Sequence, residues 1–75
     1  MKISVIIAAY NSETTIGRTL ESIFRQSRPA DEIIVVDDGS TDRTAEIIRG
    51  FDGVKYLFQQ NQGPAAARNN GVKSA

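Results

Sequence analysis

Two runs of apolar, mostly β-branched residues place the strongest constraint on what this chain can fold into. Residues 3–10 read ISVIIAAY, and residues 32–37 read EIIVVD. Neither run alternates polar with apolar residues, which is the pattern of a strand covered on both faces, as in a parallel sheet. A third run, VKYLF at residues 54–58, is shorter and alternates only in part. The sequence therefore predicts three strands of a parallel sheet.

A helical pattern follows each predicted strand. After the first strand, Asn11 and Ser12 are good helix caps and Glu13 suits a first turn. This helix should stop near Ser27, because Pro29 disfavours helical geometry in the residue before it.

The other two helices have their own start signals. The second should start within residues 40–42, where every residue is a plausible cap, and should fray between Gly50 and Gly53. The third should have Gly63 as its cap and Pro64 as its first residue.

The order of these elements predicts an α/β, Rossmann-like β-α-β-α-β-α fold. Right-handed crossovers then give a three-stranded parallel sheet with strand order 3-2-1. Residues 1–75 make at most one small domain, since a chain this short buries only about 60–65% of its unfolded surface. The first strand would have an open edge, and the last helical pattern carries no stop signal. We therefore expect a partial domain.

Composition excludes several classes of function. The nine basic and nine acidic residues give a net charge of zero, and neither cysteine nor histidine is present. No net field attracts nucleic acid or an anionic membrane, no disulfide can form, and the commonest general base is missing. The longest apolar run is too short to span a bilayer. We expect a cytoplasmic protein with no nucleic-acid partner and no membrane segment in this chain.

Polar side chains follow all three predicted strands, where open parallel sheets bind ligands. No G-x-G-x-x-G and no phosphate-binding P-loop is present, which argues against dinucleotide and P-loop enzymes. A carboxylate only accepts hydrogen bonds, so it suits a nucleobase N–H, ribose hydroxyls or a metal. Successive residues of a strand point to opposite faces, so only one of Asp37 and Asp38 should face the cleft.

These residues also have purely structural interpretations. The two acids can hold a turn with Gly39, Tyr10 can cover the core, and Arg68 can be a solvated surface residue. Two other functions stay open. A receiver-like signalling module also has paired acids after a strand, but it needs an acid after a later one, and residues 58–60 are FQQ. A non-catalytic α/β unit could instead self-associate through exposed sheet edges.

Three segments together resemble the start of the family 2 glycosyltransferases, which are inverting enzymes of the GT-A fold. They are SVIIAAYNSETTIGRTLESIFRQS, DEIIVVDDGSTDRTAEII and NQGPAAARNNGVKSA, in this order along the chain. The match covers nearly all of residues 1–75. Strand one usually ends in Pro-x-Tyr-Asn in that family, and Ala8 replaces the proline here.

The resemblance implies that residues 1–75 are the nucleotide-binding half of a GT-A domain. Ala8 and Tyr10 would line the base, with the Tyr10 ring near uracil, and Asp38 would accept a hydrogen bond from a base N–H. Glu13 would approach the ribose or the base edge, and Arg68 would reach the base or phosphate side. The residues expected to support this site are Asn11, Asp37 and Gly39.

The same resemblance implies what this segment would not contain. The family's metal-binding D-x-D element and its general base would lie beyond Ala75, so no catalytic and no metal-binding residue is expected here. The full enzyme would use Mg or Mn. Residues 1–75 alone would bind the nucleotide of a nucleoside-diphosphate sugar, most often UDP, weakly and without transferring sugar. We also expect a homo-oligomer through exposed sheet edges.

Overall fold

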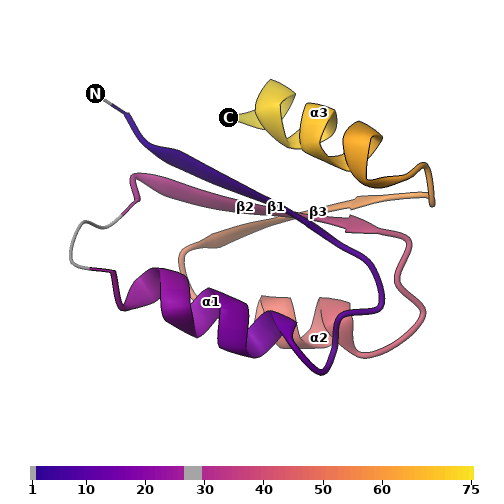
Figure 1. The fold of residues 1–75 in the computed structure, drawn as a ribbon, viewed down its shortest axis with the longest axis horizontal. Helices are drawn as coiled ribbons and strands as arrows, with labels where there is room; N and C mark the ends of the chain where they lie inside the picture. Colours follow the sequence, from indigo (N-terminus) through magenta and orange to yellow (C-terminus); the bar gives the residue numbers. More distant parts are fainter. Residues whose placement is uncertain (1, 27–29) are drawn as a thin grey trace.

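The computed structural model describes residues 2–26 and 30–75 and contains a single parallel sheet with helices on both faces (Figure 1). Its elements are β1 (Ser4–Ala9), α1 (Ile16–Phe24), β2 (Glu32–Asp38), α2 (Thr44–Arg49), β3 (Val54–Gln59) and α3 (Pro64–Ser74). The sheet order is β1-β2-β3, so β2 is central. The expected strand order 3-2-1 describes the same arrangement read from the opposite edge of the sheet, with β2 between β1 and β3. The predicted α/β fold with a three-stranded parallel sheet is confirmed.

The sheet lies between two helical layers (Figure 1). Helices α1 and α2 cover one face and contact each other, whereas α3 packs across β1 and β2 on the other face. All three strands are parallel and in register, with Ala9 opposite Asp37 and Asp38 opposite Gln59. The carboxyl ends of the strands therefore meet at one edge of the molecule.

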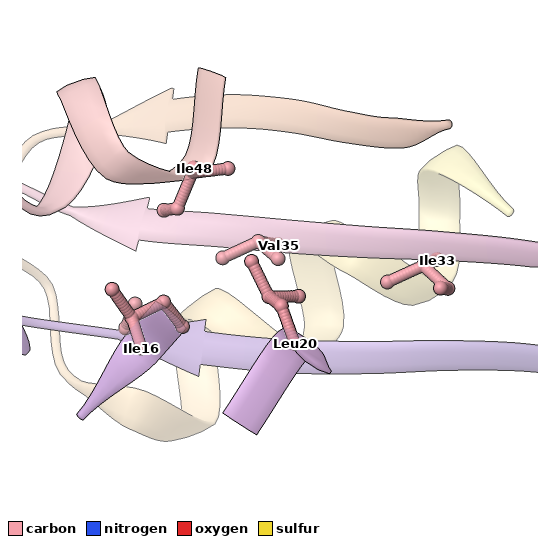
Figure 2. Packing of buried hydrophobic residues seen from close by; sticks show 6 residues of the cluster. Ile16, Leu20, Ile33, Val35 and Ile48 are labelled. Atoms are coloured by element: carbon pink, nitrogen blue, oxygen red, sulfur yellow. The ribbon is translucent and has the colours of Figure 1, made fainter. Parts of the chain in front are cut away.

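Strand β2 supplies apolar side chains to both layers because successive residues of a strand point to opposite faces. Ile33 and Val35 pack with Leu20 and Ile48 under α1 and α2 (Figure 2). On the other face, two further β2 residues pack with α3, and these are Ile34 and Val36. β2 is buried on both faces, as predicted. β1 is instead an edge strand whose residues are mostly half-buried.

Helix α3 lies close to the sheet because Gly71 has no side chain. A Cβ at this position would overlap Cγ2 of Ile6 and would lie 3.3 Å from Cγ2 of Val36. The predicted start of α3 is confirmed: Gly63 is the cap and Pro64 the first residue. The fixed φ of proline suits this position, and its missing N–H would have no partner inside the helix anyway.

The predicted start of the first helix is wrong. Helix α1 begins at Ile16, and residues 11–15 form a bend and a turn in which Asn11 has a φ of 45°. Their side chains do not cap α1, because Asn11 Oδ1 accepts from the Thr41 N–H and the Ser12 hydroxyl donates to the Tyr10 carbonyl. The N–H groups of residues 11–13 donate to side chains of the chain segment after β2. α1 ends at Phe24, and the predicted stop near Ser27 lies outside the described residues.

Helix α2 also begins later than predicted, at Thr44 rather than within residues 40–42. Residues 40–43 form the connection from β2. Asp42 still caps the helix in part, because its Oδ1 accepts a hydrogen bond from the Thr44 N–H at 3.0 Å.

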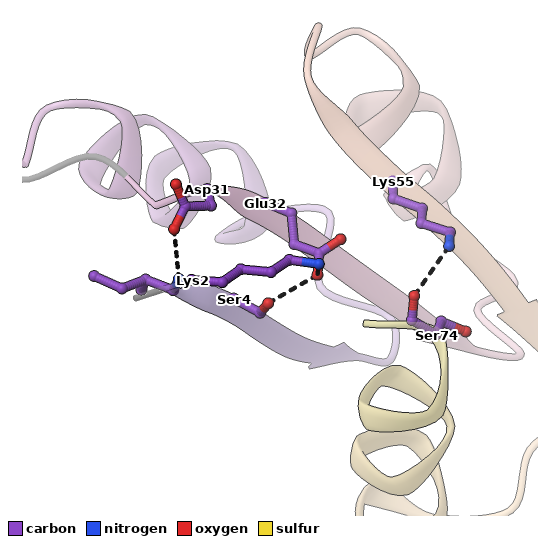
Figure 3. Close-up of polar contacts among 7 residues, drawn as sticks. Lys2, Ser4, Asp31, Glu32, Lys55 and Ser74 are labelled. Carbon is purple, nitrogen blue, oxygen red and sulfur yellow. Dashed lines mark hydrogen bonds and ion pairs between the residues drawn. The ribbon is translucent and has the colours of Figure 1, made fainter.

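Polar contacts close the amino ends of the strands (Figure 3). Glu32 accepts a hydrogen bond from the Ser4 hydroxyl at 2.8 Å and pairs with Lys2 at 3.1 Å. The hydrogen bond from Ser4 and the contact with Lys2 lower the pKa of Glu32. Lys55 donates to the Ser74 carbonyl at 3.2 Å, which ties β3 to the end of α3.

None of the helices in the described part of the chain is long and apolar enough to cross a membrane.

Candidate functional site

A pocket of about 380 Å³ opens at the carboxyl ends of β1 and β2. Its size lies within the range of small-molecule sites. Seven residues line it, and they are Ala8, Ala9, Tyr10, Asp38, Asn61, Gly63 and Pro64. The site therefore combines the ends of two neighbouring strands with the start of α3, which is where an open parallel sheet is expected to bind ligands.

Tyr10 and the two alanines form the β1 side of this pocket. Ala8 and Ala9 are the last residues of β1, and their small side chains leave room next to the sheet. Tyr10 follows directly, and its side chain is 51% exposed. A half-exposed aromatic ring at the rim of a pocket offers a flat apolar surface on which a planar ligand can stack.

Asp38 forms the other side of the pocket, and its carboxylate holds the loop between β3 and α3. Oδ1 accepts hydrogen bonds from Gln59 Nε2 at 2.7 Å and from the Gln62 N–H at 2.8 Å. Oδ2 accepts one from the Gly63 N–H at 3.0 Å, at the start of α3. These bonds, above all the one from Gln59, lower the pKa of Asp38.

The carboxylate of Asp38 still has acceptor capacity. An ionised carboxylate has about four lone-pair sites, and the three N–H donors occupy two on Oδ1 and one on Oδ2. Within the described part of the chain, this leaves one lone-pair site on Oδ2 without a protein donor. The residue itself is only 4% exposed, so its orientation is set by the fold.

Asp37 does not line the pocket, because it points to the opposite face of the sheet. Its Oδ1 accepts from the Ser40 N–H at 2.9 Å, and its Oδ2 accepts from the Tyr56 hydroxyl at 2.7 Å. Burial, followed by the hydrogen bond to Asp37, raises the pKa of Tyr56 to about 12. Asp37 thus fixes the turn after β2 to strand β3.

Asn11 and Gly39 shape the backbone around the pocket. Asn11 Oδ1 accepts from the Thr41 N–H at 2.8 Å, which joins the chain after β1 to the chain after β2. Gly39 has a φ of 78°, and a Cβ there would lie 3.0 Å from the Asn61 backbone nitrogen. A side chain at this position would be strained and would push a lining residue aside.

The structure does not bring Glu13 and Arg68 into the pocket lining. Glu13 lies in the turn before α1, where its backbone N–H donates to Asp42 Oδ2 at 3.2 Å. Arg68 lies on α3 and is exposed. Of the five residues predicted to bind nucleotide, the pocket unites Ala8, Tyr10 and Asp38.

Several lining residues were not predicted as site residues. Asn61 follows β3, and the sequence indicates only a polar residue at a strand end there, whereas Gly63 and Pro64 are predicted only as a helix start. Asn61 reaches the pocket because Asp38 draws the loop of residues 60–63 over the strand ends. A polar residue after the third strand was the only signal in the sequence.

Within residues 2–26 and 30–75, no group of three or more acidic side chains is arranged to hold a metal ion. The paired acids at the end of β2 cannot act together, since Asp37 and Asp38 point to opposite faces and each is already hydrogen-bonded. The residues of this segment do not fit the divalent metal that the resemblance implies.

Comparison with known protein families gives one match over most of the chain. Residues 4–75 match the family described as Glycosyl transferase family 2.

Similar full-length proteins carry related names. An uncharacterized glycosyltransferase of Rickettsia felis is 42% identical over 77 residues, which is 99% of this chain and 13% of that protein. A validoxylamine A glucosyltransferase of Streptomyces hygroscopicus subsp. limoneus is 41% identical over 97% of this chain and 18% of its own length. An uncharacterized glycosyltransferase of Nostoc sp. is 41% identical over all of this chain and 25% of its own length. The chain thus spans a quarter or less of these relatives.

Proposed function

Since this chain belongs to glycosyl transferase family 2, we propose that residues 1–75 bind the nucleotide of a nucleoside-diphosphate sugar, with UDP as the first candidate. The segment would be the first half of a GT-A domain in an inverting transferase. The observation that carries this proposal is the shared pocket of Tyr10 and Asp38 at the ends of β1 and β2.

The chemistry of the pocket suits a pyrimidine base. The Tyr10 ring offers a stacking surface, and stacking of a base on an aromatic side chain contributes about 1–3 kcal/mol. The available lone pair on Asp38 Oδ2 can accept a hydrogen bond from a ring N–H of uracil. Ala8 and Ala9 leave space for the base between these two groups.

Glu13 and Arg68 would act outside the pocket lining. Both are exposed: Glu13 lies in the turn between β1 and α1, and Arg68 lies on α3. We propose that Glu13 contacts the ribose and that Arg68 contacts the phosphates once the nucleotide is bound. A metal ion and a general base for the transfer step would come from other parts of a protein as long as the relatives, so the segment alone would not transfer sugar.

A matched pair of aromatic variants tests nucleotide binding. Tyr10→Ala should weaken UDP binding about tenfold, because it removes the stacking surface. Phe58→Ala should leave binding unchanged, since Phe58 is similarly exposed, at 59%, but does not line the pocket. Binding is measured by NMR titration of the amides of Ala8, Tyr10 and Asp38 with UDP. A wild-type chain whose pocket amides do not respond to millimolar UDP would contradict the proposal.

The family match favours a transferase over the receiver-like module. Treatment with acetyl phosphate should leave every aspartate unmodified, and a phosphorylated aspartate detected by mass spectrometry would reverse this preference.

A further inference from the structure

Hydrogen bonds join two chain segments at the pocket rim: one segment donates backbone N–H groups, and the other accepts them with its side chains. Segment 10–13 follows β1 and carries Tyr10, and segment 40–44 follows the turn after Asp38. Three consecutive N–H groups of segment 10–13 donate to segment 40–44. The bonds are Asn11 N to Ser40 Oγ at 2.9 Å, Ser12 N to Thr44 Oγ1 at 2.7 Å, and Glu13 N to Asp42 Oδ2 at 3.2 Å.

Thr44 occupies the centre of this connection. Its side chain is fully buried, and its hydroxyl uses both of its roles, since it accepts from the Ser12 N–H and donates to Asp42 Oδ1 at 2.5 Å. Thr44 is the first residue of α2, whose Ile48 belongs to the core. The Ser12 N–H is thereby attached to a rigid part of the molecule.

The hydrogen bond from Ser12 to Thr44 should stabilise segment 10–13 more than the hydrogen bonds on either side of it. It is partly buried, whereas the bonds from Asn11 to Ser40 and from Glu13 to Asp42 are exposed. Water can replace an exposed partner at little cost, but an N–H that loses a buried partner is left unsatisfied. Loss of Thr44 as a partner should therefore destabilise segment 10–13 more than loss of Ser40 or Asp42.

Besides these three bonds, segment 10–13 is held by an exposed bond from the Thr41 N–H to Asn11 Oδ1 at 2.8 Å and by the Ser12 carbonyl, which accepts from the Thr15 and Ile16 N–H groups. It contains no helical or strand residues beyond the end of β1, and Asn11 has a φ of 45°, which side chains other than glycine adopt at a cost. Tyr10, which lies next to Asn11, is half exposed. Its position relative to Asp38 depends on what anchors the residues that follow.

We propose that Thr44 is a positioning residue that holds the Tyr10 side of the pocket at the distance from Asp38 that the nucleotide base requires. Its hydroxyl does this through the Ser12 N–H and does not touch the ligand. The proposal rests on the nucleotide-binding function proposed above, and the two can be tested separately.

The test compares Thr44→Val with Thr44→Ser in the 75-residue chain. Valine has the shape of threonine without the hydroxyl, whereas serine keeps the hydroxyl and loses a methyl group. Hydrogen exchange of the Ser12 amide reports on the bond itself, ¹⁵N relaxation at Tyr10 reports on the motion of the segment, and NMR titration with UDP reports on binding.

The expected result has three parts. The Ser12 amide is protected in the wild type and exchanges about tenfold faster or more in Thr44→Val. UDP binding weakens about fivefold in the valine variant, and Thr44→Ser restores both properties to near the wild-type values. Ser40→Ala serves as a control, since it removes the exposed bond from the Asn11 N–H and leaves Thr44 and its partners in place, so exchange at Ser12 should not change.

Other results would overturn the proposal. An unprotected Ser12 amide in the wild type removes the bond, and this measurement decides the matter even if Thr44→Val does not fold. Faster Ser12 exchange in the valine variant with unchanged UDP affinity shows that the bond does not position Tyr10. If the wild type binds no UDP, the proposed function fails, while increased motion at Tyr10 in Thr44→Val still supports the positioning role and unchanged motion rejects it.

Discussion

Asp37 and Asp38 are adjacent in the chain, yet their carboxylates lie on opposite faces of the sheet. Asp38 faces the pocket and holds the loop before α3, whereas Asp37 faces α2 and holds the turn after β2 together with Tyr56. The alternation of side chains along a strand separates them. The two adjacent acids therefore do not form a metal site. Each carboxylate accepts hydrogen bonds from its own set of donors, on its own side of the sheet.

The hydroxyl of Tyr56 gives a direct test of the Asp37 centre. Burial and then the bond to Asp37 raise the pKa of Tyr56 to about 12, against the opposing charge of Arg49, which lies 5.0 Å from the ring centre. Because the chain has two tyrosines, the phenolate absorbance of a Tyr10→Phe variant reports Tyr56 alone. We expect a midpoint near this value, and a lower midpoint when Asp37→Asn is added. An unchanged midpoint in the double variant would argue against the bond.

At the scale of elements, the packing of α3 depends on residues too small to interfere with the sheet. Helix α3 carries few apolar side chains, and Ala67 and Gly71 are its buried residues. The helix backbone lies close to the strands, and the resulting dispersion attraction takes the place of contacts by large side chains. This helix begins at the pocket, so its distance from the sheet also sets the positions of Gly63 and Pro64.

The same substitution at two glycines should therefore have opposite effects. Gly71→Ala places a methyl group against Ile6 and should destabilise the chain by about 1–2 kcal/mol, since overpacking outweighs the gain in helix propensity. Gly17→Ala in α1 places its methyl group 3.6 Å from Ile47 Cγ2, an ordinary contact, and should stabilise by about 0.5 kcal/mol. Urea unfolding measures both. Equal changes at the two sites would mean that α3 does not lie this close.

For the whole molecule, stability should depend on pH at both ends of the scale. The folded chain lowers the pKa of Glu32 chiefly through Ser4, and that of Asp38 chiefly through Gln59. Burial raises the pKa of Asp42, but hydrogen bonds from Thr44 and the Glu13 N–H outweigh it and leave that pKa lowered. These carboxylates stabilise the folded state while ionised, whereas Tyr56 stabilises it while neutral.

The sign of each effect follows from which state binds more protons. Below the ordinary pKa values of 3.8 for Asp and 4.5 for Glu, the unfolded chain binds protons first, so the free energy of unfolding should fall as the pH decreases through this range. Above pH 10, the unfolded chain releases the Tyr56 proton first, so stability should fall again up to about pH 12.

Urea unfolding across this pH range provides the measurement. Asp38→Asn should lose less stability between neutral and acidic pH than the wild type, because one of the responding groups is gone. A free energy of unfolding that does not change from pH 7 down to pH 3 would contradict these pKa directions. Self-association through the edge strand β1 stays a prediction, and light scattering over a range of concentrations tests it.

The sequence was sufficient to predict the elements that depend on local patterns. The uninterrupted apolar run at Ile33–Val36 predicts a strand buried on both faces, Gly63 and Pro64 predict the start of α3, and the β-α alternation predicts a parallel sheet with a pocket at its carboxyl end. The similar run around Ile6 predicts a strand but not its place at the edge, where it is only half-buried. The two-residue period of a strand predicts that only one of Asp37 and Asp38 faces the cleft, and the family resemblance indicates that it is Asp38. All of these signals involve residues close together in the chain.

Only the tertiary structure decided how the rim of the pocket is built. Residues 11–13 have helix-starting side chains, yet their N–H groups bond to residues about 30 positions later, such as Thr44. Asp38 is held by the Gln62 and Gly63 N–H groups, 24 and 25 positions away. Local preferences of a few tenths to about 1 kcal/mol yield to such long-range bonds once the sheet brings the segments together, because an unsatisfied buried polar group costs more.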